Sequence, residues 1–501
     1  MEINQINWGY SLFSTLVLLA DFFIRITLSV RVIMRKRPYG VSFAWLIVIL
    51  LVPFIGGGAY LLFGENRLPE KRMARAKVSY KTYMSWLQNL KTRAPVSWHS
   101  LNPTCMPLQR QAETLVGIPA MSGNKLTLIT NPNNIITSIT HSIDNAHTSC
   151  HLQFYIWEEG GNVEQVAQAL IRAAGRGVTC RILLDSIGSR KFLKSEKAKQ
   201  MRNAGIKIEE SLPAGIINVF FSRIDIRNHR KIVVIDGEVA YTGSQNMVDP
   251  EVFKLDSGVG KWIDVMVKAE GPVVESLAGT FISDWFLETE ETALNSELLL
   301  KDIDSVRQAG DMHPCPMVGQ SAVQLVPSGP GFVPEAIHHL LLTTIYGARK
   351  ELILTTPYFI PDEPLLAALK AAAQRGVDVK IILPRDNDSV LVKYASRARY
   401  EDLAASGVSI YLFYGGLLHS KSVTVDGDLS LFGSVNLDMR SFWLNFEATL
   451  FIYCRTFTRE LKSIQQGYLA ESTLLDLKQF RQRTKVEKFK ENLLLLISPL
   501  L

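Results

Sequence analysis

The amino-acid sequence predicts an α/β protein with two pseudo-symmetric α/β/α halves, preceded by an N-terminal two-helix transmembrane hairpin. Three observations predict this architecture. Two apolar segments open the chain, an eight-residue motif occurs twice, and the predicted elements around both motif copies follow the same order. Each half reads strand, helix, strand, turn, strand, an order typical of sheets covered by helices. A chain of 501 residues has room for about two to four domains.

The two apolar segments are expected to form the hairpin, residues 1–64, with helices over about 10–33 and 41–63. Residues 41–63 carry no charged side chain, and at about 1.5 Å per residue such a helix spans a bilayer core of about 30 Å. The alternative is a buried helix of a soluble domain. Asp21 and Arg25, four residues apart in the first segment, are expected to form a structural ion pair that lowers the cost of insertion.

Basic residues on both sides of the second apolar segment bear on the orientation of the hairpin. The flank that follows the segment is the richer one, with Arg67, Lys71, Arg72, Arg75, Lys77 and Lys81. Basic flanks favour the cytoplasmic side, so the catalytic part is expected there. Residues 65–119 are predicted to be a basic juxtamembrane linker, whose first part is either a helix at the lipid headgroups or a solvated helix, and whose part from 94 onward is irregular.

Composition limits the classes of partner and site. The net charge of +6 suits an anionic partner but does not distinguish lipid from nucleic acid. Five scattered cysteines without a C-x-x-C spacing suggest neither a disulfide framework nor a zinc site.

The duplication extends beyond the motif and predicts the domain boundaries. The first half covers residues 120–291 and the second 319–480, with a polar connecting segment at 292–318 and an amphipathic tail at 481–501. The strands predicted before the motif lie at 151–157, 176–185 and 204–208 in the first half, and at 351–358, 375–384 and 406–410 in the second. The tail is too short to span a bilayer and docks either on its surface or inside the protein.

The duplicated motif is His-x-Lys-x-x-x-x-Asp, followed at a fixed offset by Gly-Ser-x-Asn. Its candidate catalytic residues are His229, Lys231, Asp236, His419, Lys421 and Asp426. The Ser and Asn residues behind them, expected to bind or support a phosphate, are Ser244, Asn246, Ser434 and Asn436. Residues two apart share one face of a strand, so each His is expected beside its Lys. Each Asp points the other way and is better interpreted as structural.

These residue types suit attack on a phosphorus atom at one site shared by the two halves. One neutral imidazole attacks and becomes a phosphohistidine, while the other donates a proton to the leaving alcohol and then deprotonates the acceptor. The Lys, Ser and Asn side chains would hold the non-bridging oxygens. No cluster with metal-ligand spacing is visible in the sequence, so neither a metal nor another cofactor is expected.

The doubled motif resembles the phospholipase D superfamily. Residues 227–231, 241–249, 415–421 and 435–441 resemble bacterial cardiolipin synthases of the phospholipase D type, and the similarity covers essentially the whole chain. The resemblance implies two phospholipase D-like domains in a multi-pass protein of the bacterial inner membrane. It also implies an activity that transfers the phosphatidyl group of one phosphatidylglycerol to a second, giving cardiolipin and glycerol, with no nucleic acid as partner.

The resemblance further implies His229 as the nucleophile and His419 as the acid and base. It implies a carboxylate that orients each histidine, assigned to Asp264 in the first half and Glu447 in the second. Three alternatives remain at this point: a phospholipase D that hydrolyses phospholipid to phosphatidic acid, a nuclease of the same superfamily, and an inactive membrane scaffold. Residues 185–188 either line the pocket or form a plain turn.

Overall fold

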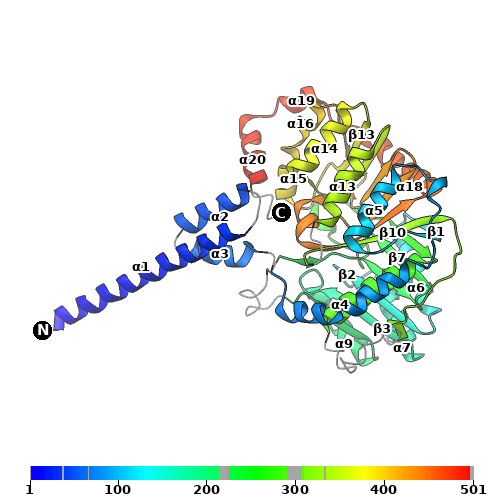
Figure 1. Cartoon of the computed structure of the whole chain (residues 1–501), viewed down its shortest axis with the longest axis horizontal. Coiled ribbons are helices and arrows are strands. Elements are labelled where there is room, and N and C mark those ends of the chain that lie inside the picture. Colours follow the sequence, from blue (N-terminus) through cyan, green and yellow to red (C-terminus); the bar gives the residue numbers. More distant parts are fainter. Residues whose placement is uncertain are drawn as a thin grey trace. The chain divides into compact units, whose positions relative to one another are not determined.

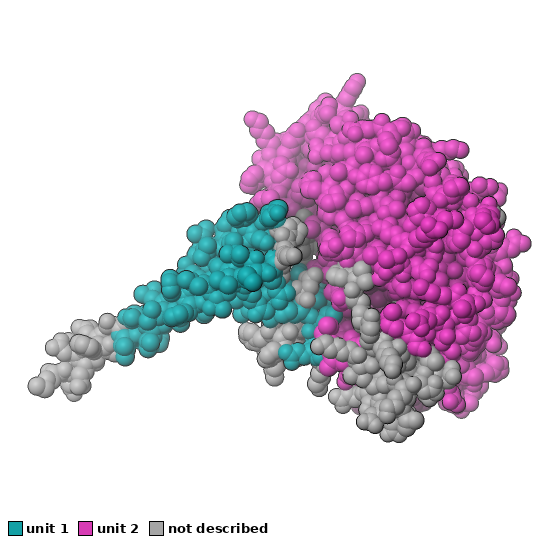
Figure 2. Space-filling model, in the orientation of Figure 1, with its two compact units in different colours: residues 1–70, 214–226 teal, residues 71–213, 227–501 magenta. Residues whose placement is uncertain are grey.

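The computed structural model describes residues 2–35, 39–52, 54–65, 67–213, 223, 225–289, 307–308, 310–331 and 335–496. The chain divides into two compact units (Figure 2). Unit 1 comprises residues 1–70 and 214–226, and unit 2 comprises residues 71–213 and 227–501.

Unit 1 contains three helices: α1 (Glu2–Met34), α2 (Tyr39–Leu51) and α3 (Ile55–Phe63). The expectation of one continuous helix over 41–63 is wrong, because α2 and α3 are separate. The sequence supplies the reason: a proline at 53 lacks an amide hydrogen and disfavours helical geometry at the residue before it. Phe54 has a φ of 52°, which no α-helix contains. Within the described residues, no helix has the combination of length and apolarity that crossing a membrane requires, and the transmembrane hairpin is not confirmed.

Two polar clusters hold the helices of unit 1 together. Arg25 pairs with Asp21 at 2.6 Å, as predicted, and Asp21 also accepts the backbone N–H of Phe54 at 3.2 Å. The second cluster was not foreseen: the buried Glu65 accepts hydrogen bonds from Arg31 at 2.7 Å and from the hydroxyl of Tyr60 at 2.8 Å. Together these contacts join α1 to both ends of α3.

Unit 2 is built on one large sheet, in which sixteen of the described strands take part. The seven strands of the first half are β1 (Met121–Ile129), β2 (Ser149–Phe154), β3 (Thr179–Asp185), β4 (Lys207–Ser211), β6 (Ile232–Ile235), β7 (Val239–Gly243) and β9 (Met266–Glu270). Their counterparts are β10 (Ser321–Ser328), β11 (Glu351–Thr355), β13 (Asp378–Pro384), β14 (Ser409–Phe413), β16 (Ser422–Val425), β17 (Leu429–Gly433) and β19 (Asn445–Tyr453).

The two halves have the same strand order and meet at the centre of the sheet. The order is β20-β14-β13-β11-β16-β17-β19-β10 and then β1-β9-β7-β6-β2-β3-β4, with β20 (Ser472–Leu474) as an extra edge strand. Strands β1 and β10 pair antiparallel, so an approximate two-fold axis passes between them. The register repeats as well: Leu152 lies opposite Val233 in the first half, and Leu354 lies opposite Val423 in the second.

Helices cover both faces of the sheet, which is why β6 is apolar at every position. Val233 and Ile235 pack toward α6 (Pro132–Asp144) and α7 (Val163–Gly175), whereas Ile232 and Val234 pack toward α10 (Val273–Glu288). Successive side chains of a strand point to opposite faces of the sheet. A strand that is buried on both faces is therefore apolar at every position. The mixed α/β fold predicted from the sequence is confirmed.

The second half is layered in the same way. The helices α5 (Cys105–Val116), α13 (Ala336–Gly347) and α14 (Glu363–Gln374) share one core on one face, and α18 (Arg455–Ala470) lies on the other. In Figure 1, α13 and α14 lie with β13, as α7 and α9 (Glu196–Asn203) lie with β3. Further short helices are α8 (Arg190–Leu193), α15 (Val390–Arg397), α16 (Tyr400–Ala405), α17 (Met439–Trp443), α19 (Leu477–Arg481) and α20 (Lys485–Leu496).

The predicted linker is more ordered than expected. Helix α4 (Glu70–Leu90) follows α3, and its residues Trp86, Leu87 and Leu90 are buried in the core that contains α10. The stretch predicted as irregular contains α5, whose Leu108 and Ala112 are buried four residues apart on one face. Pro107 lies in the first turn of α5, where a proline costs no hydrogen bond.

Candidate active site

The two motif histidines lie just outside the central strands, a correction to the prediction that each shares a strand with its lysine. His229 follows the two-residue strand β5 (Arg227–Asn228) and precedes β6, and His419 follows β15 (Leu417–Leu418) and precedes β16. Each short strand pairs with the opposite half: β5 runs parallel to the start of β19, and β15 runs parallel to β8 (Trp262–Ile263). At both histidines, therefore, the backbone is hydrogen-bonded to the opposite half of the molecule.

Each histidine takes its carboxylate from the other half of the molecule. The backbone N–H of His229 donates to the carbonyl of Phe446 at 2.8 Å, and the next residue, Glu447, accepts from His229 Nδ1 at 2.9 Å. In the same way the N–H of His419 donates to Ile263 at 2.8 Å, and Asp264 accepts from His419 Nδ1 at 2.7 Å. Asp264 and Glu447 thus act as histidine partners, but assigning each to the histidine of its own half is wrong.

The carboxylates fix the tautomer of the imidazoles. A carboxylate that accepts from Nδ1–H leaves the lone pair of Nε2 unprotonated and free to attack. Burial lowers the pKa of both histidines to about 4, although Glu447 raises the pKa of His229 and Asp264 raises that of His419. Burial raises the pKa of each carboxyl group, but the adjacent histidine and lysines outweigh it and the pKa is lowered. At neutral pH the site therefore holds two neutral imidazoles against two carboxylates.

Both motif lysines are buried beside their histidines. Lys231 Nζ donates to the carbonyl oxygen of His229 at 2.7 Å, and Lys421 Nζ donates to that of His419. Burial lowers the pKa of Lys421 to about 8 and that of Lys231 well below its usual value. The charge of Lys421 helps to lower the pKa of Lys231, so the two ammonium groups, one from each half, repel each other. Two cations confined together in this way favour an anionic ligand between them.

The serine hydroxyls were predicted to bind or support a phosphate, and in the structure they bind the segments that carry Glu447 and Asp264. Ser434 Oγ donates to Glu447 Oε2 at 2.5 Å and accepts the N–H of Ala448 at 3.0 Å. Ser244 Oγ donates to the carbonyl of Val265 at 3.2 Å and accepts the N–H of Val265 at 3.0 Å. These hydroxyls hold the carboxylate-bearing segments in place, so they support the histidine partners.

The two asparagines differ from each other. Asn246 Oδ1 accepts the backbone N–H of Ile156 at 3.1 Å and is therefore engaged within the fold. The Oδ1 atom of the buried Asn436 has no hydrogen-bond partner among the described residues. A buried acceptor without a partner costs free energy unless a ligand satisfies it, so Asn436 is the better candidate for a substrate contact.

The motif aspartates, included among the candidate catalytic residues, have structural roles instead. Asp236 has a φ of 52°, and its carboxylate accepts the backbone N–H groups of His147, Thr148 and Ser149. Asp426, with a φ of 54°, accepts those of Arg349, Lys350 and Glu351. Each aspartate lies in the turn that follows β6 or β16, and it fixes the start of a neighbouring strand, Ser149 of β2 or Glu351 of β11.

Arg230, between the motif His and Lys, was not among the candidates. Its Nε donates to the carbonyl of Glu447 at 3.0 Å, and its Nη1 donates to Asp284 Oδ2 at 2.5 Å. The same carboxylate group pairs with Arg72, which the sequence assigned to the linker. The sequence pointed to His229 and Glu447 separately, but the hydrogen bond by which Arg230 joins them is a tertiary contact that leaves no signal in the sequence.

Aromatic rings surround the two imidazoles. Tyr155 lies edge-on to His229 with ring centres 5.1 Å apart, and Trp262 lies 4.3 Å from His419. Tyr358 also approaches His419 edge-on, with ring centres 6.5 Å apart. Rings of this kind exclude water from the imidazoles and strengthen charge interactions around them.

Residues 185–188 form a turn that positions the first histidine. Asp185 is fully buried and accepts the N–H groups of Ile187 and Gly188, each at 3.0 Å, as a turn-forming aspartate does. It also accepts the N–H of Asn228 at 2.9 Å, directly before His229. The turn interpretation is therefore correct, and the turn supports the site.

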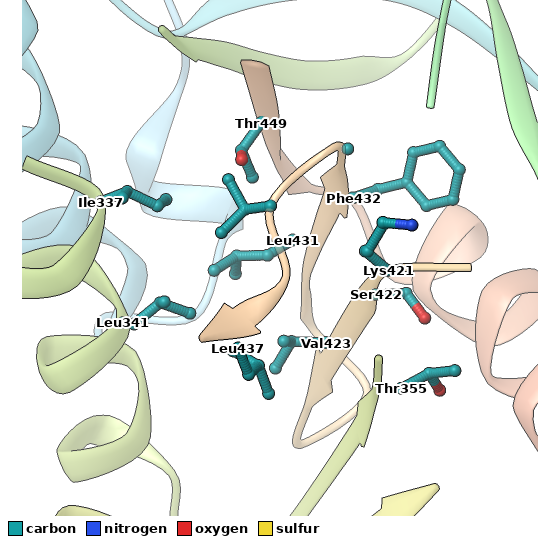
Figure 3. Close-up of a pocket in the computed structure, with 12 residues that line it drawn as sticks. Ile337, Leu341, Thr355, Lys421, Ser422, Val423, Leu431, Phe432, Leu437 and Thr449 are labelled. Atoms are coloured by element: carbon teal, nitrogen blue, oxygen red, sulfur yellow. The ribbon is translucent and has the colours of Figure 1, made fainter. Parts of the chain in front are cut away.

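A small pocket lies beside Lys421, on the side of β16 and β17 that faces α13 (Figure 3). Its wall is mainly apolar, with Ile337 and Leu341 from α13 and Val423 and Leu431 from the strands. It is part of the packed support under Lys421. Among the described residues, no three His, Cys, Asp or Glu side chains are grouped so that they could hold a metal ion.

Comparison with known proteins identifies the family to which the chain belongs. The sequence model of a family described as cardiolipin synthase, PLD-like domain, matches residues 139–285 and 341–467, which include both histidine motifs. The chain belongs to this family of the phospholipase D superfamily. A second model, described as the phospholipase D-nuclease N-terminal region, matches residues 23–65.

Full-length relatives support the assignment. The cardiolipin synthases A of Yersinia pseudotuberculosis and Yersinia pestis are 44% identical to the chain over 492 residues, covering 98% of this chain and 99% of each relative. Among solved structures, a phosphatidylserine synthase from Haemophilus influenzae matches with a TM-score of 0.58 at 14% identity, over 79% of this chain and 100% of that one. This structural likeness shows the shared fold.

Proposed function

We propose that the chain is a phosphatidyltransferase that joins two phosphatidylglycerol molecules into cardiolipin and releases glycerol. The single observation that carries this proposal is the pair of exchanged histidine–carboxylate contacts, found in a chain that is 44% identical to cardiolipin synthases A over nearly its whole length. Two neutral imidazoles and two buried lysines in one site suit double displacement at a phosphodiester.

In the first step Nε2 of His229 attacks phosphorus, and the bond from phosphorus to the headgroup glycerol oxygen breaks. The negative charge of the bound phosphodiester raises the pKa of His419 above its value in the free site, so His419 can carry the proton that the glycerol oxygen takes up. In the second step His419, now neutral, removes a proton from a hydroxyl of the second phosphatidylglycerol. That oxygen attacks phosphorus, the bond from phosphorus to His229 breaks, and the enzyme is regenerated.

The remaining residues position these groups. Lys231 and Lys421 neutralise the non-bridging oxygens, and Asn436 offers its unpartnered Oδ1 to a hydroxyl of a glycerol headgroup. Arg230 and Ser434 hold Glu447 in register with His229. The chemistry needs no metal ion, because the two lysines supply the positive charge.

We also propose that unit 1 attaches the enzyme to the bacterial inner membrane as a hairpin, with the catalytic unit on the cytoplasmic side. Support comes from α1, on which large apolar side chains such as Leu12, Phe13 and Leu18 are more than half exposed. A proteoliposome digest with an added protease tests this proposal: the hairpin is protected in the expected arrangement, and its complete digestion contradicts the attachment.

The deciding experiment uses detergent-purified protein in EDTA with phosphatidylglycerol labelled in the headgroup or in the acyl chains. We expect glycerol release and a four-chain product from the wild type, and neither from His229→Ala or His419→Ala. The exposed His141 provides a matched control, and His141→Ala should retain full activity. Phosphatidic acid as the only product would identify a hydrolase. Loss of activity in EDTA would contradict the metal-free mechanism.

A further inference from the structure

Helix α20 has one face that is held in the protein and one that is not. On the held face, Glu491 is only 1% exposed and accepts from Arg397 Nε at 2.9 Å and from Arg483 Nε at 3.0 Å. On the opposite face four apolar side chains are 48–78% exposed: Val486, Phe489, Leu493 and Leu496. Their spacing of three, four and three residues keeps them in one stripe along the helix.

Lysines border this stripe on both sides. At 3.6 residues per turn, Lys485 and Lys490 lie roughly 60–80° to either side of the stripe's centre, and both are exposed. An apolar face bordered by lysines is the pattern of helices that lie in the interface of a bilayer, where the lysine stems cover apolar surface and the ammonium groups reach the anionic headgroups. The positive border is what favours a lipid surface over an uncharged protein partner.

Helix α15 carries further exposed apolar side chains. It packs against α20, as Figure 1 shows, and at its start Val390 and Leu391 are 65% and 43% exposed. The loop that precedes α15 contacts the wall of the site, because Asp388 Oδ1 accepts the hydroxyl of Tyr358 at 2.9 Å. The ring of Tyr358 in turn lies beside His419. Contacts through Asp388 and Tyr358 therefore connect the start of α15 to His419.

We propose that this α15–α20 face docks on the surface of an anionic phospholipid bilayer and holds the His419 side of the active site against the lipid headgroups; it comprises Val390, Leu391, Val486, Phe489, Leu493 and Leu496. The proposal rests on the proposed function, since it supplies a lipid-bound substrate to that site. It assigns the C-terminal helix a role separate from that of the N-terminal hairpin: the hairpin keeps the chain at the membrane, and the α15–α20 face orients the site.

The first test compares two forms of one substrate with the full-length protein. The double variant Phe489→Ser/Leu493→Ser should lose about tenfold in kcat/KM toward phosphatidylglycerol in vesicles, because burial of these side chains in lipid is lost. Toward a short-chain phosphatidylglycerol below its critical micelle concentration it should match the wild type. Met317→Ser is the control, since Met317 is 67% exposed, as Phe489 is at 66%, but lies outside the face.

The outcomes separate this proposal from the function itself. Equal loss on both substrates means a structural role for α20 and overturns docking, as does an unchanged rate on vesicles. A wild type that makes no cardiolipin from either substrate contradicts the proposed function instead.

A second readout does not depend on activity. Hydrogen exchange of residues 485–496 in the full-length protein should slow in nanodiscs containing phosphatidylglycerol, compared with nanodiscs of phosphatidylcholine alone. Lys485→Glu/Lys490→Glu should abolish the difference. Equal protection in both lipids overturns the proposal, and protection that instead rises with protein concentration identifies a second copy of the chain as the occupant.

Discussion

At the scale of single residues, the site depends on side chains that hold a carboxylate partner of a histidine in place. Arg230 binds the backbone of Glu447, whose carboxylate sets the tautomer of the His229 imidazole. Ser434 binds the same carboxylate from the other side. Glu447 thus has its backbone and its side chain fixed by separate residues, which leaves little freedom for the Nδ1 contact.

The carboxylate partners should be needed for chemistry far more than for binding. Glu447→Gln and Asp264→Asn keep the shape of the site but can present an amide N–H to Nδ1, which favours the wrong tautomer. We expect kcat to fall by about 10²–10⁴ with little change in KM. A rise in KM with kcat unchanged would contradict this role of the carboxylates.

The pH dependence of kcat/KM should be broad, with its alkaline limit set by a lysine. His229 must be neutral in the free enzyme to attack, and its lowered pKa keeps it so down to about pH 4. Lys421 loses its charge as the pH rises through about 8, so activity should fall there. In Lys421→Arg the guanidinium does not titrate, and the alkaline limb should move upward even if the maximal rate is lower. If the alkaline limb does not move in this variant, a group other than Lys421 sets it.

At the scale of elements, the glycine of Gly-Ser-x-Asn explains how β17 meets β19. A Cβ on Gly433 would lie 2.2 Å from the carbonyl oxygen of Ala448 and 2.8 Å from Thr449 Cα, both backbone atoms. Only glycine allows this approach, which brings Ser434 within reach of Glu447. The motif glycine is therefore a packing requirement of the strand that carries the histidine partner.

Gly433→Ala should accordingly destabilise the protein by about 1–3 kcal/mol, because the backbone of β19 has to move. The control is Gly467→Ala in α18, where an added Cβ meets nothing within 4 Å. Alanine is the better helix former, so this variant should be neutral or more stable by up to about 1 kcal/mol. Thermal unfolding in detergent measures both, and equal midpoints would show that β17 and β19 can separate without cost.

The elements also show what the sequence could and could not predict. Strands such as β6 were predictable because their apolar side chains pack locally on both faces, and the motif residues were visible because they recur. Strands β5 and β8 have only two residues, and their pairing with the opposite half leaves no periodic signal. The exchange of Asp264 and Glu447 depends on that pairing, so a search for partners within each half could not find it.

At the scale of the whole molecule, the buried histidines make the fold sensitive to acid. Burial lowers the pKa of His151 to about 3 and those of His229 and His419 to about 4, whereas unfolding returns them to about 6.5. The unfolded chain then binds more protons, so stability should fall as the pH drops from about 6.5 toward 4.

Thermal unfolding of the wild type across that range should therefore show a falling midpoint. His151→Gln should weaken the dependence, since one of the three groups no longer titrates, and it leaves the catalytic residues untouched. A midpoint that stays constant between pH 6.5 and 4 would contradict the neutral state of these imidazoles.

The exchange of carboxylates across the two-fold axis has a consequence for the ancestry of the chain. A single half holds a histidine whose partner lies elsewhere, so an ancestor of half the length could have worked only as a pair of identical copies. Fusion of the two copies would then have preserved the complete site from the start. Once joined, the copies were free to diverge, and one histidine could specialise in attack while the other specialised in moving the proton.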